Sequence, residues 1–188
     1  MIETSDRLFA FINDLPSEER AALEANLPAV KDLAARLAAA IGSIFTRTLD
    51  LSGGPGVISR LVKKGGSWGY ANPEITDDRY PTAGTGLKQV RYRILHGADL
   101  KRPDGIVYTV DVDAAFAKER MRRCTAAEAL LVPAEDQQIG RAEHPLVAFI
   151  AGARYAFVVY EGVAGRGLDL TSGDGGWDAH GGFVVVCE

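Results

Sequence analysis

Two side chains that could do chemistry stand in the most apolar and β-prone stretch of the chain, residues 144–161. His144 precedes one apolar run, and Arg154 interrupts the stretch ten residues later. A charged guanidinium inside an apolar strand is costly unless it meets an anion. An imidazole at the start of the preceding strand could hold a metal. A turn at Gly152 would bring the two side chains together, so we expect an anion or metal site here.

This stretch resembles the end of the double-stranded β-helix core of iron(II)/2-oxoglutarate-dependent oxygenases, especially the prolyl-hydroxylase-like group. In that family a His on one strand ligates iron, and a Gly-x-Arg on the next strand presents the Arg to 2-oxoglutarate. His144, Gly152 and Arg154 match this pattern, as do the aromatic residues Tyr155 and Tyr160. The resemblance implies Fe(II) bound by His144 and the distal carboxylate of 2-oxoglutarate bound by Arg154.

A second piece of the resemblance lies upstream. The strand-like segment with Tyr92 and the turn with Asp104 resemble the part of the family that carries the His-x-Asp iron ligands. The resemblance therefore implies that Asp104 is a metal ligand and that Tyr92 contacts the cofactor. It covers about residues 90–160 and would make the protein a hydroxylase of an unknown small-molecule or protein substrate.

The upstream piece departs from the family at its first iron ligand. Arg102 stands two positions before Asp104, where the family has His. A guanidinium has no acceptor, and its charge repels a metal. Either another histidine, His96 or His180, replaces the ligand, or the site binds an organic anion without metal, or the likeness is accidental. Without the first His the protein would be a degenerate, non-catalytic member. If the likeness is accidental, His144 is an ordinary residue at a strand start, and Arg154 pairs with an acid such as Glu161 or Glu143.

A further resemblance uses overlapping residues, so at most one of the two can hold. His96 and Gly97 on one strand and Tyr108 on the next, followed by a helix, are similar to ADP-ribosyltransferases of the His–Tyr–Glu type, with Glu161 as the candidate acid. The Gly-rich run 162–182 also gathers carboxylates that could suit calcium, but their spacing does not match a calcium loop and fits ordinary turns.

Charge suggests a function of a different class. The net charge of −4 argues against a general nucleic-acid binder. Residues 51–125 nevertheless carry a net +5 between flanks of −3 and −6. We expect this basic block to pair with the acidic flanks inside the fold, because unlike blocks of one domain usually neutralise each other. Its alternative use is a face for a partner, so the rival to an oxygenase is a non-enzymatic bacterial binding protein, such as an immunity, toxin-neutralising or assembly factor.

The expected fold is α+β, with an N-terminal helical segment over 1–50 packed on a mainly β domain over 51–188. The β domain would be a sandwich or jelly roll of the double-stranded β-helix type. Apolar residues three and four apart over 30–48 predict an amphipathic helix that packs on the core or forms a homo-oligomer. Gly and Pro over 65–86 predict a long loop. We expect strands at 90–94, 106–112, 129–132, 146–150, 155–160 and 183–187, a helix at 114–123, and a short helix or strand at 57–64.

Membrane and disulfide classes are not expected. No apolar run reaches the ~18 residues of a membrane-spanning helix, and the first residues lack the order of a signal peptide. Two cysteines are too few for a disulfide framework. The sequence thus predicts a cytoplasmic protein.

Overall fold

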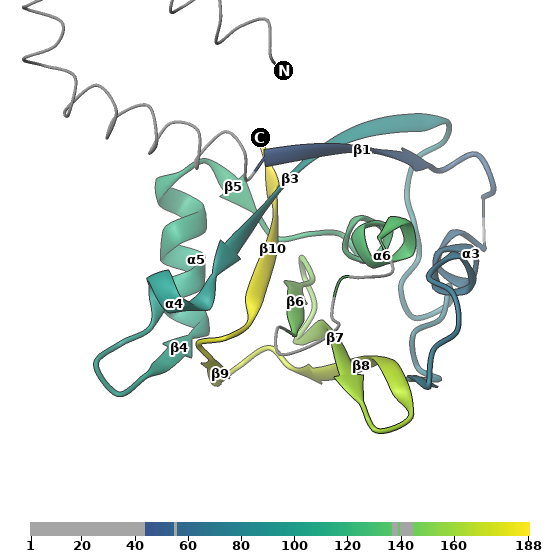
Figure 1. Cartoon of the computed structure of the whole chain (residues 1–188). Coiled ribbons are helices and arrows are strands. Elements are labelled where there is room, and N and C mark those ends of the chain that lie inside the picture. Colours follow the sequence, from purple (N-terminus) through teal and green to yellow (C-terminus); the bar gives the residue numbers. More distant parts are fainter. Residues whose placement is uncertain (1–43, 55, 137–138, 140–144) are drawn as a thin grey trace, which may run out of the picture. The chain divides into compact units, whose positions relative to one another are not determined.

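Continuous runs of buried, mainly apolar residues form the central strands Leu146–Phe149 and Gly182–Cys187 of a mixed sheet, and helices cover both of its faces (Figure 1). The computed structural model describes residues 44–54, 56–136, 139 and 145–188. They belong to one unit, Ile44–Glu188, and its mixture of sheet and helix confirms the α+β class. The helices of the described residues are α3 (Val57–Lys64), α4 (Gly97–Leu100), α5 (Thr109–Lys118) and α6 (Ala126–Glu135).

Over the described residues, the main sheet has eight strands in the order β1-β3-β10-β6-β7-β8-β2, with β5 added on β10. Most neighbours are antiparallel, but β6 and β10 run parallel, and so do β2 and β8. A separate ribbon pairs β4 with β9. The strands are β1 (Ile44–Asp50), β2 (Tyr70–Ala71), β3 (Leu87–His96), β4 (Ile106–Tyr108), β5 (Met121–Arg122), β6 (Leu146–Phe149), β7 (Tyr155–Gly162), β8 (Gly165–Ser172), β9 (Gly176–Asp178) and β10 (Gly182–Cys187).

Two apolar cores lie on opposite faces of the sheet. Successive residues of a strand point to opposite faces, and Val184 and Val185 of β10 belong to different cores. The larger core packs α3 and α6 against the sheet, and the smaller core packs α5. The candidate site described below lies on the α6 side.

The helix expected over 30–48 is wrong at its C-terminal end, because Ile44–Asp50 is strand β1. This segment pairs with β3 along its whole length, and Phe45 stacks on Tyr92 of that strand. Pairing with a neighbouring strand here overrides the local three-and-four spacing. The remainder of the predicted N-terminal helical segment, including its proposed role in a homo-oligomer, lies outside the described residues.

The predicted strand over 106–112 and helix over 114–123 are only partly right, and the predicted strand over 129–132 is wrong. The strand expected over 106–112 ends at Tyr108, and helix α5 begins at Thr109 rather than at 114 and ends before 123. Val112 and Phe116, four residues apart, are both buried in the smaller core, which fixes the helical period. The apolar run 129–132 lies inside α6, where every residue of the run is buried. A helix buried on all sides shows no polar stripe and is easily mistaken for a buried strand.

The other expectations fare better. The strands expected at 90–94, 146–150, 155–160 and 183–187 are confirmed in β3, β6, β7 and β10. Residues 57–64 form a helix, and residues 65–86 form a long loop that contains only the short strand β2. The Gly-rich run 162–182 is more regular than expected, since it contains β8 and β9. Among the helices of the described ranges, none combines the length and hydropathy needed to cross a membrane.

Candidate functional site

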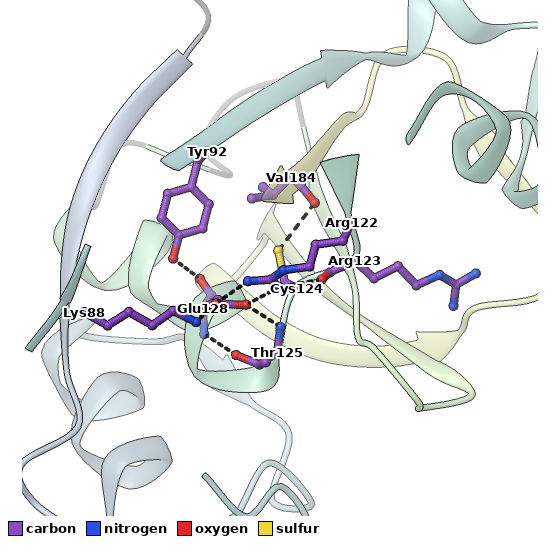
Figure 2. Close-up of polar contacts among 8 residues, drawn as sticks. All are labelled: Lys88, Tyr92, Arg122, Arg123, Cys124, Thr125, Glu128 and Val184. Carbon is purple, nitrogen blue, oxygen red and sulfur yellow. Dashed lines mark hydrogen bonds and ion pairs between the residues drawn. The ribbon is translucent and has the colours of Figure 1, made fainter. Parts of the chain in front are cut away.

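A buried carboxylate, Glu128, lies in the first turn of α6 (Figure 2). The sequence Thr125-x-x-Glu128 forms a capping box, in which each residue binds the backbone N–H of the other. Thr125 Oγ1 accepts from Glu128 N at 3.3 Å, and Glu128 Oε2 accepts from Thr125 N at 2.8 Å. The cap therefore fixes both the start of the helix and the place of the carboxylate, whose side chain is 0% exposed.

Two cations from other elements meet this carboxylate (Figure 2). Arg122 of β5 donates from both terminal nitrogens to the two oxygens of Glu128, at 2.8 and 2.7 Å. Lys88 of β3 donates from Nζ to Oε1 at 2.9 Å. The side chains of Lys88 and Arg122 are 49% and 32% exposed. We call Lys88, Arg122, Thr125 and Glu128 the Glu128 cluster; it contains two positive charges and one negative charge.

Glu128 and Arg122 keep their charges at neutral pH. Burial raises the pKa of Glu128, but the hydrogen bonds from Arg122, the Thr125 backbone and Lys88 outweigh burial and lower the pKa to about 2. The bond to Glu128 in turn raises the pKa of Arg122. A carboxylate held this firmly as an anion is poorly suited to accept a proton in a reaction. The cluster is an electrostatic arrangement rather than an acid–base pair.

A cleft of about 160 Å³ lies beside the Glu128 cluster. The polar part of its lining is formed by Lys88, Thr125, Glu128 and Thr82, and the rest is apolar. A molecule of liquid water occupies about 30 Å³, so the cleft has room for roughly five groups of that size. The apolar lining residues are Leu49, Leu51, Pro81, Ala83, Ala126 and Ala127.

Tyr92, the expected cofactor contact, lies in the larger core behind this cluster. Its side chain is fully buried, its ring stacks on Phe45, and its hydroxyl donates to the backbone oxygen of Glu128 at 2.9 Å (Figure 2). Cys124 is also buried, with its Sγ 3.6 Å from the Val184 oxygen. Burial raises the pKa of both Tyr92 and Cys124. Both groups therefore stay protonated and serve packing, and Cys124 is not an activated nucleophile.

Asp104, an expected metal ligand, lies in an exposed turn and binds its own neighbours. Oδ1 accepts from Ile106 N and Oδ2 from the Tyr108 hydroxyl, both at 3.0 Å. The hydrogen bond from Ile106 is the main reason that the pKa of Asp104 is lowered. Arg102, at the position of the family's first His, donates two hydrogen bonds to Asp111 and lies 4.5 Å above the Tyr108 ring. The turn is thus closed by internal contacts.

The histidines that could replace a ligand gather at one end of the sheet. His96 ends β3 and is paired in register with Gly182, the first residue of β10. His180 precedes that strand by two residues, and its Nδ1 lies 2.6 Å from Asp178 Oδ1. Strand β6 begins beside β10 at this same end. His144, which comes just before β6 in the chain, lies outside the described residues.

Arg154 is on the surface, just before β7, and not inside an apolar strand. Its side chain is 78% exposed, and Nε lies 3.7 Å from Asp174 Oδ2. Within the described ranges, no three side chains of the His, Cys, Asp and Glu types lie close enough to share a metal ion. Glu161, the candidate acid of the ADP-ribosyltransferase resemblance, is exposed near the end of β7. The Tyr108 hydroxyl of that resemblance is the one bound by Asp104.

The basic block pairs with the acidic C-terminal flank only in part, because most of the carboxylates that it meets among the described residues come from the block itself. Lys88 and Arg122 bind Glu128, which belongs to the acidic C-terminal flank. The Lys64 pair with Glu135 also reaches this flank. The other pairs of the block among the described residues are Arg79 with Glu74, Arg93 with Glu119, Arg102 with Asp111, and Arg123 with Asp113.

Comparisons with known proteins found no match: no family model, no curated protein and no solved structure matches the chain.

The sequence analysis missed the Glu128 cluster, although part of its signal was present. Thr125 and Glu128 have the spacing of a capping box before an apolar run, which predicts a helix start. Arg122 is close to them in sequence, six residues before Glu128. Nothing in the sequence indicates that Lys88 joins them, because it is forty residues from Glu128 and reaches it only through the fold.

Proposed function

We propose that the chain is a binding protein that receives a negatively charged group in the cleft beside the Glu128 cluster. The observation that carries the proposal is the position of the Lys88 ammonium. The Lys88 side chain lines the cleft, is about half exposed, and donates one hydrogen bond to Glu128. An ammonium has three donors, so Lys88 keeps capacity for an incoming acceptor.

Electrostatics around the cleft favour an anion. Glu128 offsets one of the two cations of the cluster, so one positive charge remains beside the cleft. The apolar lining lowers the local dielectric and strengthens the attraction of that charge for a ligand. The first turn of α6 adds to it, because Ala126 and Ala127 line the cleft at the positive end of the helix dipole.

The proposal is tested by titrating the isotope-labelled full chain with sodium acetate and with sodium phosphate and following its backbone amide signals. We expect saturable shifts of the Thr125, Ala126 and Ala127 amides. Lys88→Met should remove them. Lys101→Met, which deletes an exposed lysine of the same basic block outside the cleft, should leave them unchanged. Shifts absent for both anions, or equal in Lys88→Met and wild type, would contradict an anion-binding cleft.

An iron(II)/2-oxoglutarate oxygenase with a jelly-roll core is our second candidate. His96 and His180 both lie near the start of β6, and this position favours the candidate. Either residue could supply the imidazole ligand that is missing at position 102. Asp104 fits a metal poorly as it stands, because both its oxygens accept hydrogen bonds and Arg102 lies beside it. Under this candidate Asp104, His144 and one further His would hold Fe(II), and Arg154 would bind 2-oxoglutarate.

The second candidate is tested by thermal stability with 2-oxoglutarate and Mn(II), together and separately, in wild type and Arg154→Ala. Ligands that bind only the folded state raise the melting temperature. A rise in wild type that is lost in Arg154→Ala would support an oxo-acid site. No shift at millimolar ligand would remove this candidate.

A further inference from the structure

The charges of the cleft limit which anion it can receive. Lys88 and Arg122 together carry two positive charges, and Glu128 already offsets one. Glu128 also lines the cleft, so a second negative charge on the ligand would lie close to a like charge in an apolar setting. A dianion, the form that phosphate takes above neutral pH, is therefore matched less well than a group with a single negative charge.

The shape and lining of the cleft limit what the anion can be attached to. Six of its ten lining residues have apolar side chains, and they come from β1, the segment after it, the long loop and α6. The volume of about 160 Å³ leaves space for a charged head and a short stem, but not for a drug-sized ligand, which needs about 300 Å³ or more. A polar stem would lose its hydration against the apolar walls without partners.

From these two limits we infer that the cleft binds a carboxylate on a short aliphatic stem. The carboxylate accepts from the Lys88 ammonium at the polar end, and the stem packs against Leu49, Leu51 and Ala83. The carboxylate belongs either to a free short-chain acid or to the C-terminus of a partner's chain. This inference rests on the proposed function, because it names the ligand of the same site.

The test compares affinities of the full chain for acetate, propionate, butyrate, hexanoate and inorganic phosphate, measured through the same amide signals. Each methylene that enters the cleft should strengthen binding by about fourfold, and the gain should stop when the cleft is full, before hexanoate. Phosphate should bind at least about tenfold more weakly than butyrate. Lys88→Met should weaken butyrate at least about tenfold, as expected for a lost hydrogen bond between charged groups.

A second variant separates the stem from the charge. Ala83→Leu adds bulk to the wall of the cleft without changing the Glu128 cluster, and it should weaken butyrate more than acetate. Thr85→Leu, in the same loop but outside the lining, is the matched control and should change neither. A short peptide that ends in Val and its C-terminal amide identify the source. Binding of the acid peptide alone indicates a partner's C-terminus, and binding of butyrate without the peptide indicates a free acid.

The outcomes distinguish the carboxylate inference from the proposed anion-binding function. Phosphate binding as tightly as butyrate, with both lost in Lys88→Met, would overturn the carboxylate inference and keep the proposed function. An affinity that does not change from acetate to butyrate would also overturn the inference. Absence of any anion-dependent shift would overturn both.

Discussion

Removing the buried charge of Glu128 should change both the stability of the protein and its response to acid. Glu128→Gln keeps the shape of the side chain but leaves Arg122 and Lys88 facing a neutral amide. Breaking a buried ion pair by removing one partner costs about 3–5 kcal/mol. Both cations are partly exposed and can regain water, so we expect the lower part of that range, about 3 kcal/mol, at pH 7.

The pH dependence gives an independent measure of the same interaction. The pKa of Glu128 falls from its ordinary 4.5 to about 2 on folding. The stabilisation is therefore fully present above pH 4.5 and is lost as the pH falls from about 4.5 to about 2. A shift of this size corresponds to about 3 kcal/mol, at 1.36 kcal/mol for each pH unit.

Urea unfolding of wild type and Glu128→Gln at pH 7, 5, 4 and 3 checks this prediction. The difference in unfolding free energy should be largest at pH 7 and 5 and should shrink as the pH falls below 4.5. Glu74→Gln removes an exposed carboxylate that is paired with Arg79, and it serves as the control with little expected effect. A wild-type advantage that stays constant from pH 7 to pH 3 would refute the charge-based account of Glu128.

Two further predictions concern the frame around the site. Arg166 is buried over the ring of Trp68 and donates to four backbone carbonyls, including those of Gly65 and Pro133. Arg166→Lys should therefore lower the free energy of unfolding, measured in urea, by about 2–4 kcal/mol. A loss under about 0.5 kcal/mol would contradict this prediction. Gly167→Ala places a Cβ 2.4 Å from Cζ of Tyr160 on the paired strand. The substitution should lower the free energy of unfolding, measured by thermal unfolding, by about 1–3 kcal/mol, and by less when Tyr160→Val is also present. An equal loss in both backgrounds would contradict the clash.

The sequence predicted those elements whose local pattern and final environment agree. Strands β6, β7 and β10 are rich in β-branched and aromatic residues and are largely buried, and each was predicted within a few residues. Strand β1 was missed because its apolar spacing also fits a helix, and only its pairing with β3 decides between the two. Helix α6 was missed because burial on all sides removes its polar stripe, and only the capping box at Thr125 marks it.

The candidate site was less predictable than the fold, because Lys88 is distant in sequence from the other three residues of the Glu128 cluster. Lys88 reaches Glu128 across forty residues, from a strand of the basic block to a helix of the acidic flank. Composition indicated that the block would meet acids, but not which lysine would border a cleft. The residue types around His144 and Arg154 predicted an anion or metal site, yet Arg154 lies at the surface opposite Asp174. An apolar sequence around a charge does not by itself mean that the charge is buried.

The two cations of the Glu128 cluster have different roles. Arg122 uses both terminal nitrogens on Glu128, and one of them also binds the Arg123 backbone oxygen, so its hydrogen-bonding capacity is largely spent inside the fold. Lys88 makes one hydrogen bond to the same carboxylate and keeps its remaining donors at the cleft. Glu128 therefore needs Arg122 in order to remain buried as an anion, and it holds the Lys88 ammonium in place. Because Glu128 already holds the Lys88 ammonium in position, the lysine side chain loses less conformational entropy when a ligand binds. The buried carboxylate therefore contributes to binding through the lysine.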